Sequence, residues 1–97
     1  LSTIHLDLKP GITLNNVQNI LKKFYNQNKF VNIKSVNSFL STNDVINTNN
    51  CLISVCKTKF KDKIIILSVI DNLIKGGAGQ AIQNMNLKFG YKISEGL

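Results

Sequence analysis

The sequence has no tryptophan and no arginine, and among its 97 residues there are one histidine, one proline and two cysteines. Nucleic-acid surfaces usually rely on arginine for bidentate contacts and on aromatic rings for stacking, so this composition argues against a nucleic-acid partner. No apolar run approaches the about 18 residues that a membrane span requires. The first residues also lack the basic-then-apolar order of a signal peptide. We therefore expect neither a membrane nor a nucleic acid as the partner.

All twelve basic residues are lysines, and with five acidic residues they give a formal net charge of +7. The lysines are scattered, apart from Lys22-Lys23 and an alternation at every second position from Lys57 to Lys63. The alternation flanks a predicted hairpin turn, where exposed lysines discourage pairing at a sheet edge. A solvated surface explains these clusters better than a nucleic-acid footprint.

Cys51 and Cys56 lie five residues apart in one strand-like run, so their side chains turn to opposite faces and cannot bridge each other. We expect buried free thiols in a reducing compartment, either the cytoplasm or the interior of an organelle. His5 has no acid or nucleophile at motif spacing, and neither cysteine has a histidine beside it in sequence. There is no Cys-x-x-Cys motif. We predict no catalytic residue and no metal ligand within this chain.

Hydrophobic periodicity in the first half predicts a strand, a helix and a second strand. Residues 2–9 alternate as a half-buried strand that ends at Pro10-Gly11. Thr13 stands at the N-cap of a helix that runs to Asn26. Its apolar stripe is Leu14, Val17, Ile20, Leu21 and Phe24. A second strand is expected within residues 30–36.

The second half predicts a long loop, two strands and a final helix. The loop covers residues 37–50 and holds one short helical turn capped around Ser41–Asp44; strands follow at 52–58 and 63–70. The unbroken apolar run of the second of these is typical of a central strand covered on both faces. In the final helix we expect an apolar stripe, a C-cap at Gly90 and a solvent-facing polar side. The stripe is Ala78, Ala81, Ile82, Met85 and Phe89, and the polar side is Gln80, Gln83, Asn84 and Asn86.

This order predicts an α+β domain with a mixed sheet and its helices packed on one face. Because the chain opens directly in a strand-like alternation without an initiator methionine, we expect it to be a piece of a longer chain.

Three glycines, at positions 76, 77 and 79, stand between the most apolar strand and the start of the final helix. Two interpretations are open. They could expose backbone N–H groups to an anion at a helix N-terminus, or they could let the helix pack closely against another backbone. A dinucleotide fingerprint is excluded because Ile82 stands where its last glycine is required. Two roles are likewise open for Asp71 and Asn72, which could contribute to a binding site or cap the helix.

The segment Ser68–Leu87 reads SVIDNLIKGGAGQAIQNMNL and closely resembles the C-terminal signature of N-acetyl-gamma-glutamyl-phosphate reductases, D-N-L-x-K-G-A-[AS]-G-Q-A-x-Q-N-M-N. Residues 8–13, LKPGIT, are similar to the L-K-P-G-V-T of that family, and residues 41–45, STNDV, to its S-T-K-D-V. The resemblance spans the whole chain. Gly77 departs from it, because alanine or serine is commoner there.

The resemblance implies that residues 1–97 are the C-terminal portion of a semialdehyde dehydrogenase catalytic and dimerisation domain, similar to the second domain of glyceraldehyde-phosphate dehydrogenases. The nucleotide-binding domain would then be absent from this chain. Enzymes of the family reduce N-acetyl-glutamyl 5-phosphate to the semialdehyde with NADPH, in arginine biosynthesis. Their catalytic cysteine and histidine match neither Cys51, Cys56 nor His5.

The resemblance implies three roles for this chain. It would serve as scaffold and form one edge of the NADP cleft, and its strands from Cys51 to Ile70 would form the interface between subunits of a homo-oligomer. Asn72, Lys75, Gly76 and Gly77 are the residues placed beside the cofactor. The alternative is a free-standing, non-catalytic α+β interaction or ligand-binding module derived from that domain. Both hypotheses predict that the isolated chain is inactive.

Overall fold

The computed structural model describes all 97 residues. In chain order the elements are β1 (Ser2–Asp7), α1 (Leu14–Tyr25), β2 (Val31–Ile33), η1 (Thr42–Asp44), β3 (Cys51–Lys57), β4 (Lys63–Ile70), η2 (Ile74–Ala78) and α2 (Gly79–Phe89). This is the order that hydrophobic periodicity predicts, and the bounds of β4 agree to the residue.

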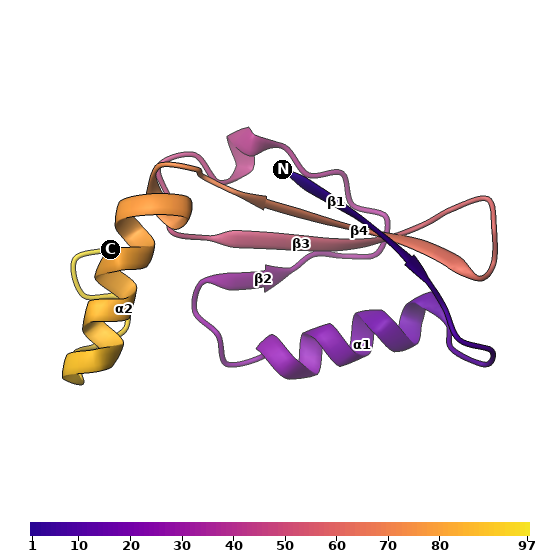
Figure 1. Cartoon of the computed structure of the whole chain (residues 1–97), viewed down its shortest axis with the longest axis horizontal. Coiled ribbons are helices and arrows are strands. Elements are labelled where there is room, and N and C mark those ends of the chain that lie inside the picture. The colour runs from indigo at the N-terminus through magenta and orange to yellow at the C-terminus, as the bar shows by residue number, and fades with distance from the viewer.

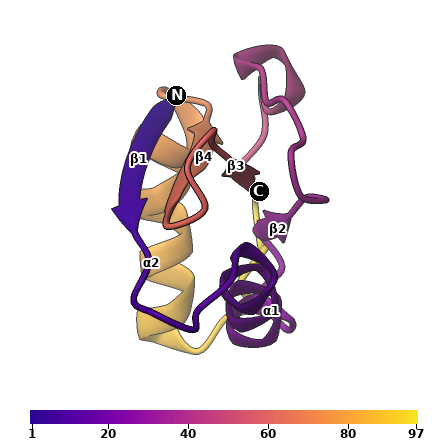
Figure 2. The ribbon, with the colours of Figure 1, turned by 90° about the vertical axis from the view of Figure 1, so that its right-hand side faces the viewer.

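The four strands form one open mixed sheet in the order β1-β4-β3-β2. β4 pairs antiparallel with both β1 and β3, whereas β2 runs parallel to β3. α1 lies on one side of the sheet, and the connection that contains η1 crosses on the other side (Figure 1). Seen from the hairpin end, α1 sits below β2 (Figure 2). The predicted α+β class with a mixed sheet is confirmed.

Local side-chain chemistry sets the start and the packed side of α1. The Thr13 hydroxyl accepts from the Asn16 N–H at 3.2 Å, and the Asn16 amide oxygen accepts from the Thr13 N–H at 2.8 Å, which completes a capping box. Gln18 is buried and donates to the Lys34 carbonyl oxygen at 2.8 Å. The predicted apolar stripe is only partly packed, because Ile20 and Phe24 are exposed.

The buried core is small and lies between the sheet, α1 and the loop that contains η1. Its apolar members are Phe30, Val45, Val55, Ile64 and Val69. Two expectations need correction. β1 is exposed along its whole length although its alternation predicts a half-buried strand, and β4 has only two buried residues although its apolar run predicts cover on both faces. Neither helix lies over the β1–β4 part of the sheet, since α1 lies beneath β2 and α2 lies beyond the end of β4 (Figure 1).

α2 differs in position and in orientation from the expected arrangement. It leads away beyond the end of β4 and packs mainly against η2, not on the face that α1 covers (Figure 1). Gly90 ends it in the left-handed conformation at φ 72°, as predicted for a C-cap. Met85 and Phe89 of the predicted apolar stripe are exposed, whereas Gln83 and Asn86 of the predicted solvent-facing side are buried.

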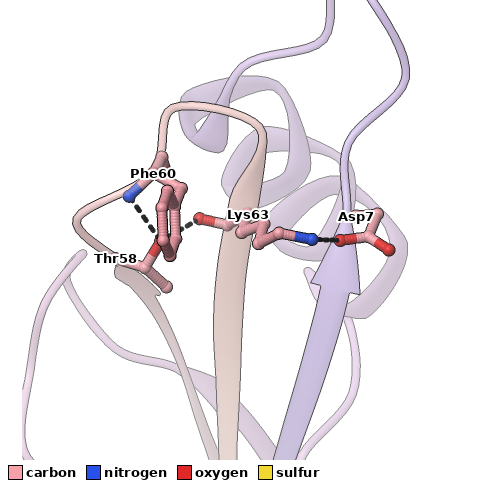
Figure 3. A network of polar contacts seen from close by, with 4 residues as sticks. All are labelled: Asp7, Thr58, Phe60 and Lys63. Atoms are coloured by element: carbon pink, nitrogen blue, oxygen red, sulfur yellow. Dashed lines mark hydrogen bonds and ion pairs between the residues drawn. The ribbon is translucent and has the colours of Figure 1, made fainter.

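The β3–β4 hairpin is closed by Thr58, whose hydroxyl donates to the Lys63 carbonyl oxygen at 2.8 Å and accepts from the Phe60 N–H at 3.1 Å (Figure 3). Beside it, Lys63 forms an ion pair with Asp7 of β1, and this contact raises the pKa of Lys63. All four lysines of the alternation are exposed, as a solvated surface requires. None of the helices has both the length and the apolar character needed to cross a bilayer.

Candidate functional site

The turn that follows β4 begins with Asp71, which caps it. One carboxylate oxygen of Asp71 accepts from the N–H groups of Leu73 at 2.8 Å and Ile74 at 3.1 Å. The other oxygen accepts from the Asn47 N–H at 2.8 Å, in the loop before β3. These three N–H groups, that of Asn47 first, lower the pKa of Asp71 from its ordinary value of 3.8. Of the two roles open to Asp71 in the sequence, the structure assigns it the capping role.

The helix therefore begins earlier than Ala78, where periodicity places its start. Residues Ile74–Ala78 form a wide π-type turn in which N–H groups bond to carbonyl oxygens five residues earlier. Gly76 donates to Asp71, Ala78 to Leu73 and Gly79 to Ile74. These are N–H groups that an anion at this turn would need. The interpretation in which the glycine cluster offers free N–H donors to an anion therefore does not apply to these three residues.

Asn72, Gly76 and Gly77 lie together on the outer, exposed side of this turn. The Asn72 side chain makes no hydrogen bond within the chain, and its Oδ1 would lie 3.3 Å from a Cβ built at Gly76. Gly77 interrupts the helical geometry with φ −146° and ψ −112°. The structure thus brings three of the four predicted cofactor-side residues onto one surface that carries a single free side-chain amide.

Lys75, the fourth predicted residue, points to the other side of the turn. Its ammonium donates to Gln83 Oε1 at 2.7 Å and stands 5.4 Å from the centroid of the Phe30 ring. Burial of the amine lowers the pKa of Lys75. This bond uses one of the three N–H donors of the ammonium.

Two residues of the predicted polar side of α2, Gln83 and Asn86, are buried and hydrogen-bonded, whereas Asn84 is exposed as expected and Gln80 is half-buried. Gln83, 8% exposed, also accepts from Asn49 Nδ2 at 2.9 Å. Asn86, 1% exposed, donates to the carbonyl oxygens of Glu95 at 2.9 Å and Ile93 at 3.3 Å and so fastens the last residues beneath the helix. Sequence reasoning missed both residues. Their spacing from Gly79 at i+4 and i+7 places all three on one side of a helix and is the signal that was available.

Two hollows of the surface bear on the location of a site. A groove of about 440 Å³ lies beside the start of α2, between the loop at residues 47–50 and the C-terminal residues, with Phe30, Ile74 and Ile82 in its lining. A depression of about 740 Å³ lies at the other end of the sheet between Pro10 and Lys61, where the lining has no histidine or cysteine. The first groove is the one that adjoins the turn at Asn72–Gly77.

Outside the turn, the chemically reactive side chains remain dispersed. Cys51 and Cys56 are free and half-buried, not buried as expected. Cys51 Sγ lies 3.5 Å from Ser68 Oγ, and His5 is exposed on β1. No three metal-ligating side chains gather at one place.

Comparison with known proteins places these features in a family. Residues 1–72 match the family described as semialdehyde dehydrogenase, dimerisation domain. The match ends at Asn72, directly after β4, so η2 and α2 follow the matched region.

Reductases are similar over the entire chain. The N-acetyl-gamma-glutamyl-phosphate reductase of Vesicomyosocius okutanii is 50% identical over 97 residues, which are 100% of this chain and 26% of that protein. The enzyme of the same name from Clostridium botulinum strain Alaska E43 is 47% identical over 97 residues, again 100% of this chain and 28% of that protein. A rice protein named as a probable chloroplastic form is 38% identical over 96 residues, 99% of this chain and 23% of that protein. The chain thus spans about a quarter of the length of these relatives.

Proposed function

Because the chain belongs to the semialdehyde dehydrogenase dimerisation-domain family, we propose that it is the C-terminal part of an NADPH-dependent N-acetyl-gamma-glutamyl-phosphate reductase. In that enzyme N-acetyl-glutamyl 5-phosphate is reduced to the semialdehyde, a step of arginine biosynthesis. The single observation that carries the proposal is the 47–50% identity to such reductases along all 97 residues. The proposed location is the cytoplasm or the interior of an organelle.

The cofactor, NADP, would meet this chain at its nicotinamide end. The turn at residues 72–77 offers a free carboxamide on Asn72 and two glycines without side chains, and an amide is a natural hydrogen-bond partner for the nicotinamide carboxamide. Phosphate fits this turn less well, because the N–H groups of Gly76, Ala78 and Gly79 are already bonded. When bound, the cofactor supplies the hydride.

Each of the four proposed residues then has a distinct task. Asn72 orients the nicotinamide by hydrogen bonding, and Gly76 and Gly77 let the ring approach the backbone closely. Lys75 contributes positive charge from behind the turn. The nucleophile and the proton-transferring histidine are proposed to come from the part of the enzyme that lies outside these 97 residues.

The sheet is proposed to form the contact between two subunits. The family is a dimerisation domain. In the β1–β4 region Ile4 and Leu6 are exposed, by 44% and 38% respectively. Ile65 and Leu67 on the other face of β4 are only half-buried. Both faces of this part of the sheet thus carry apolar side chains that are not fully covered, and exposed apolar surface is typical of protein interfaces. A homo-oligomer would bury it.

The alternative, a free-standing interaction or ligand-binding module, is less well supported by the burial pattern. Only five apolar residues are buried, and the large apolar side chains that are exposed outnumber them. A domain that functions alone must bury enough apolar surface to offset its conformational entropy. This chain leaves much of that surface for another part of the protein.

The test is an assay of the full-length protein encoded by the reading frame around this segment. We expect NADPH-dependent reduction of N-acetyl-glutamyl 5-phosphate, and no turnover when the 97-residue chain is assayed alone. An upstream frame without a glycine-rich strand-turn-helix and a cysteine, or turnover by the isolated chain, would contradict the proposal.

A further inference from the structure

The turn η2, the helix α2 and the loop before β3 meet at one atom, Gln83 Oε1. Lys75 reaches it from η2 at 2.7 Å, and Asn49 reaches it from the loop before β3 at 2.9 Å. Gln83 and Asn49 are 8% and 6% exposed, so the hydrogen bond between them is buried, whereas Lys75 is half-buried and its bond to Gln83 is only partly shielded from water. Hydrogen bonds to a charged donor in such surroundings are stronger than neutral ones. The junction joins the glycine turn to the body of the domain.

The charge of Lys75 fixes the orientation of both amides. An ammonium only donates, so Gln83 must present its oxygen to it, and Asn49 must in turn present its NH₂ group to that oxygen. Asn49 Oδ1 is consequently left buried without a hydrogen-bond partner, facing Gly79. A neutral amide pair could reorient to satisfy this oxygen. The absence of a partner for Asn49 Oδ1 is therefore a consequence of the amide orientations that the hydrogen bond from Lys75 imposes.

Lys75 also directly adjoins the part of the turn that has no side chains to hold it. Gly76 and Gly77 follow it, and Gly77 departs from helical geometry. At its beginning the turn is held by the cap from Asp71, and at Lys75 by the bond to Gln83 and the Phe30 ring. Without the second attachment, the two glycines are the most easily rearranged residues of the segment.

We propose that Lys75 is a positioning residue, which acts through Gln83 to hold the Gly76–Gly77 turn and the Asn72 side chain in place and does not itself contact the cofactor. The cofactor half of this inference rests on the proposed function; the anchoring half concerns the chain alone. It also changes the role of Lys75 from the direct cofactor contact that the family resemblance implies.

The anchoring half is tested by hydrogen exchange of residues 73–80 in the full-length protein, with Lys75→Met as the variant. Methionine keeps an unbranched apolar stem near Phe30 but cannot donate to Gln83. We expect exchange at Gly76, Ala78 and Gly79 to become about tenfold faster, as for loss of one charge-assisted hydrogen bond. Lys88→Met removes the same charge from an exposed position in the last turn of α2 and should leave this segment unchanged.

The cofactor half is tested by NADPH kinetics of Lys75→Met, Gln83→Leu and the double variant. Because both residues act through one contact, we expect each single variant to raise the KM for NADPH about tenfold and the double variant to be no worse than either. Lys75→Arg, which keeps a charged donor, should restore most of the affinity. Effects that multiply in the double variant would mean that Lys75 contacts the cofactor itself and would overturn the inference.

The two measurements separate the possible failures. Unchanged exchange in Lys75→Met overturns the inference whether or not the enzyme is active. Faster exchange together with wild-type protein that neither binds NADPH nor reduces the acyl phosphate supports the anchor and overturns the proposed function. A thermal midpoint for each variant, compared with Lys88→Met, shows whether a loss comes from global unfolding instead; faster exchange accompanied by an equal loss of global stability would count against a local anchor.

Discussion

Gly79 lies against Asn49 so closely that a Cβ built on Gly79 would stand 2.4 Å from Asn49 Oδ1. The same Cβ would also lie 2.8 Å from the Ile74 carbonyl oxygen, which belongs to backbone and cannot swing away. Of the two interpretations of the glycine cluster, close packing is therefore the one that applies at this position. Gly76 and Gly77 stay on the exposed side of the turn and have no comparable contact.

Gly79→Ala should destabilise the protein by about 1–3 kcal/mol, the usual cost of forcing an extra methyl group into a packed contact. The change is measured by urea denaturation. Ala81→Ser, at an exposed position of the same helix, should stay within about 0.5 kcal/mol. Equal stabilities of the two variants would show that the helix can move away from Asn49 at no cost.

Thr13→Ala should lower stability by about 1 kcal/mol, because it removes the side chain that caps α1 and accepts from Asn16. Thr42→Ala is the matched control, since Thr42 is exposed and its hydroxyl makes no hydrogen bond. Thermal or denaturant unfolding compares the two. If both alanine variants lose the same stability, the capping box contributes nothing specific.

Asp71 should contribute to stability in a pH-dependent way. Its pKa is lowered below 3.8 in the folded protein, first by the Asn47 N–H, so the unfolded chain binds the proton more readily. The stabilising contribution is therefore complete above about pH 3.8 and is lost as the pH falls through the lower, folded value. Asp71→Asn should flatten the acid limb of the unfolding profile below that pH. An unchanged slope would contradict the assignment of Asp71 as the cap.

Asn72→Ala should weaken NADPH binding or turnover in the complete enzyme by about tenfold, the effect of losing one well-placed hydrogen bond to the cofactor. Its folding should be unaffected, because the Asn72 side chain is exposed and makes no hydrogen bond within the chain. Asn19→Ala, an exposed asparagine on α1, serves as the control. Wild-type kinetics for Asn72→Ala would remove this residue from the site.

Local signals in the sequence predicted the elements that depend on local chemistry. The Thr13 cap, the short turn with its Ser41–Asp44 capping box, the left-handed Gly90 and the bounds of β4 all follow from residues within a few positions of one another. Each of these features is decided by hydrogen bonds or backbone conformations that the chain satisfies by itself. The location of the candidate turn at the end of β4 was predictable for the same reason.

Which side of each helix is buried was not predictable in the same way. Periodicity marks Met85 and Phe89 as apolar and Gln83 and Asn86 as polar, but burial in this chain depends on partners 34 residues away, as for Asn49 and Gln83. A buried amide is stable where its hydrogen bonds are made, and the sequence pattern does not show that they are.

The position of β1 at the margin of the sheet affects how oligomers of this chain can be interpreted. Only β4 pairs with it, so the outer row of N–H and C=O groups from Ser2 to Asp7 is open to any extended peptide, including another copy of itself. A sample of the 97 residues alone can therefore self-associate by strand addition and elute at twice its mass. A dimer of that kind would differ from the proposed subunit contact, and the two are distinguished by whether Thr3→Pro abolishes association.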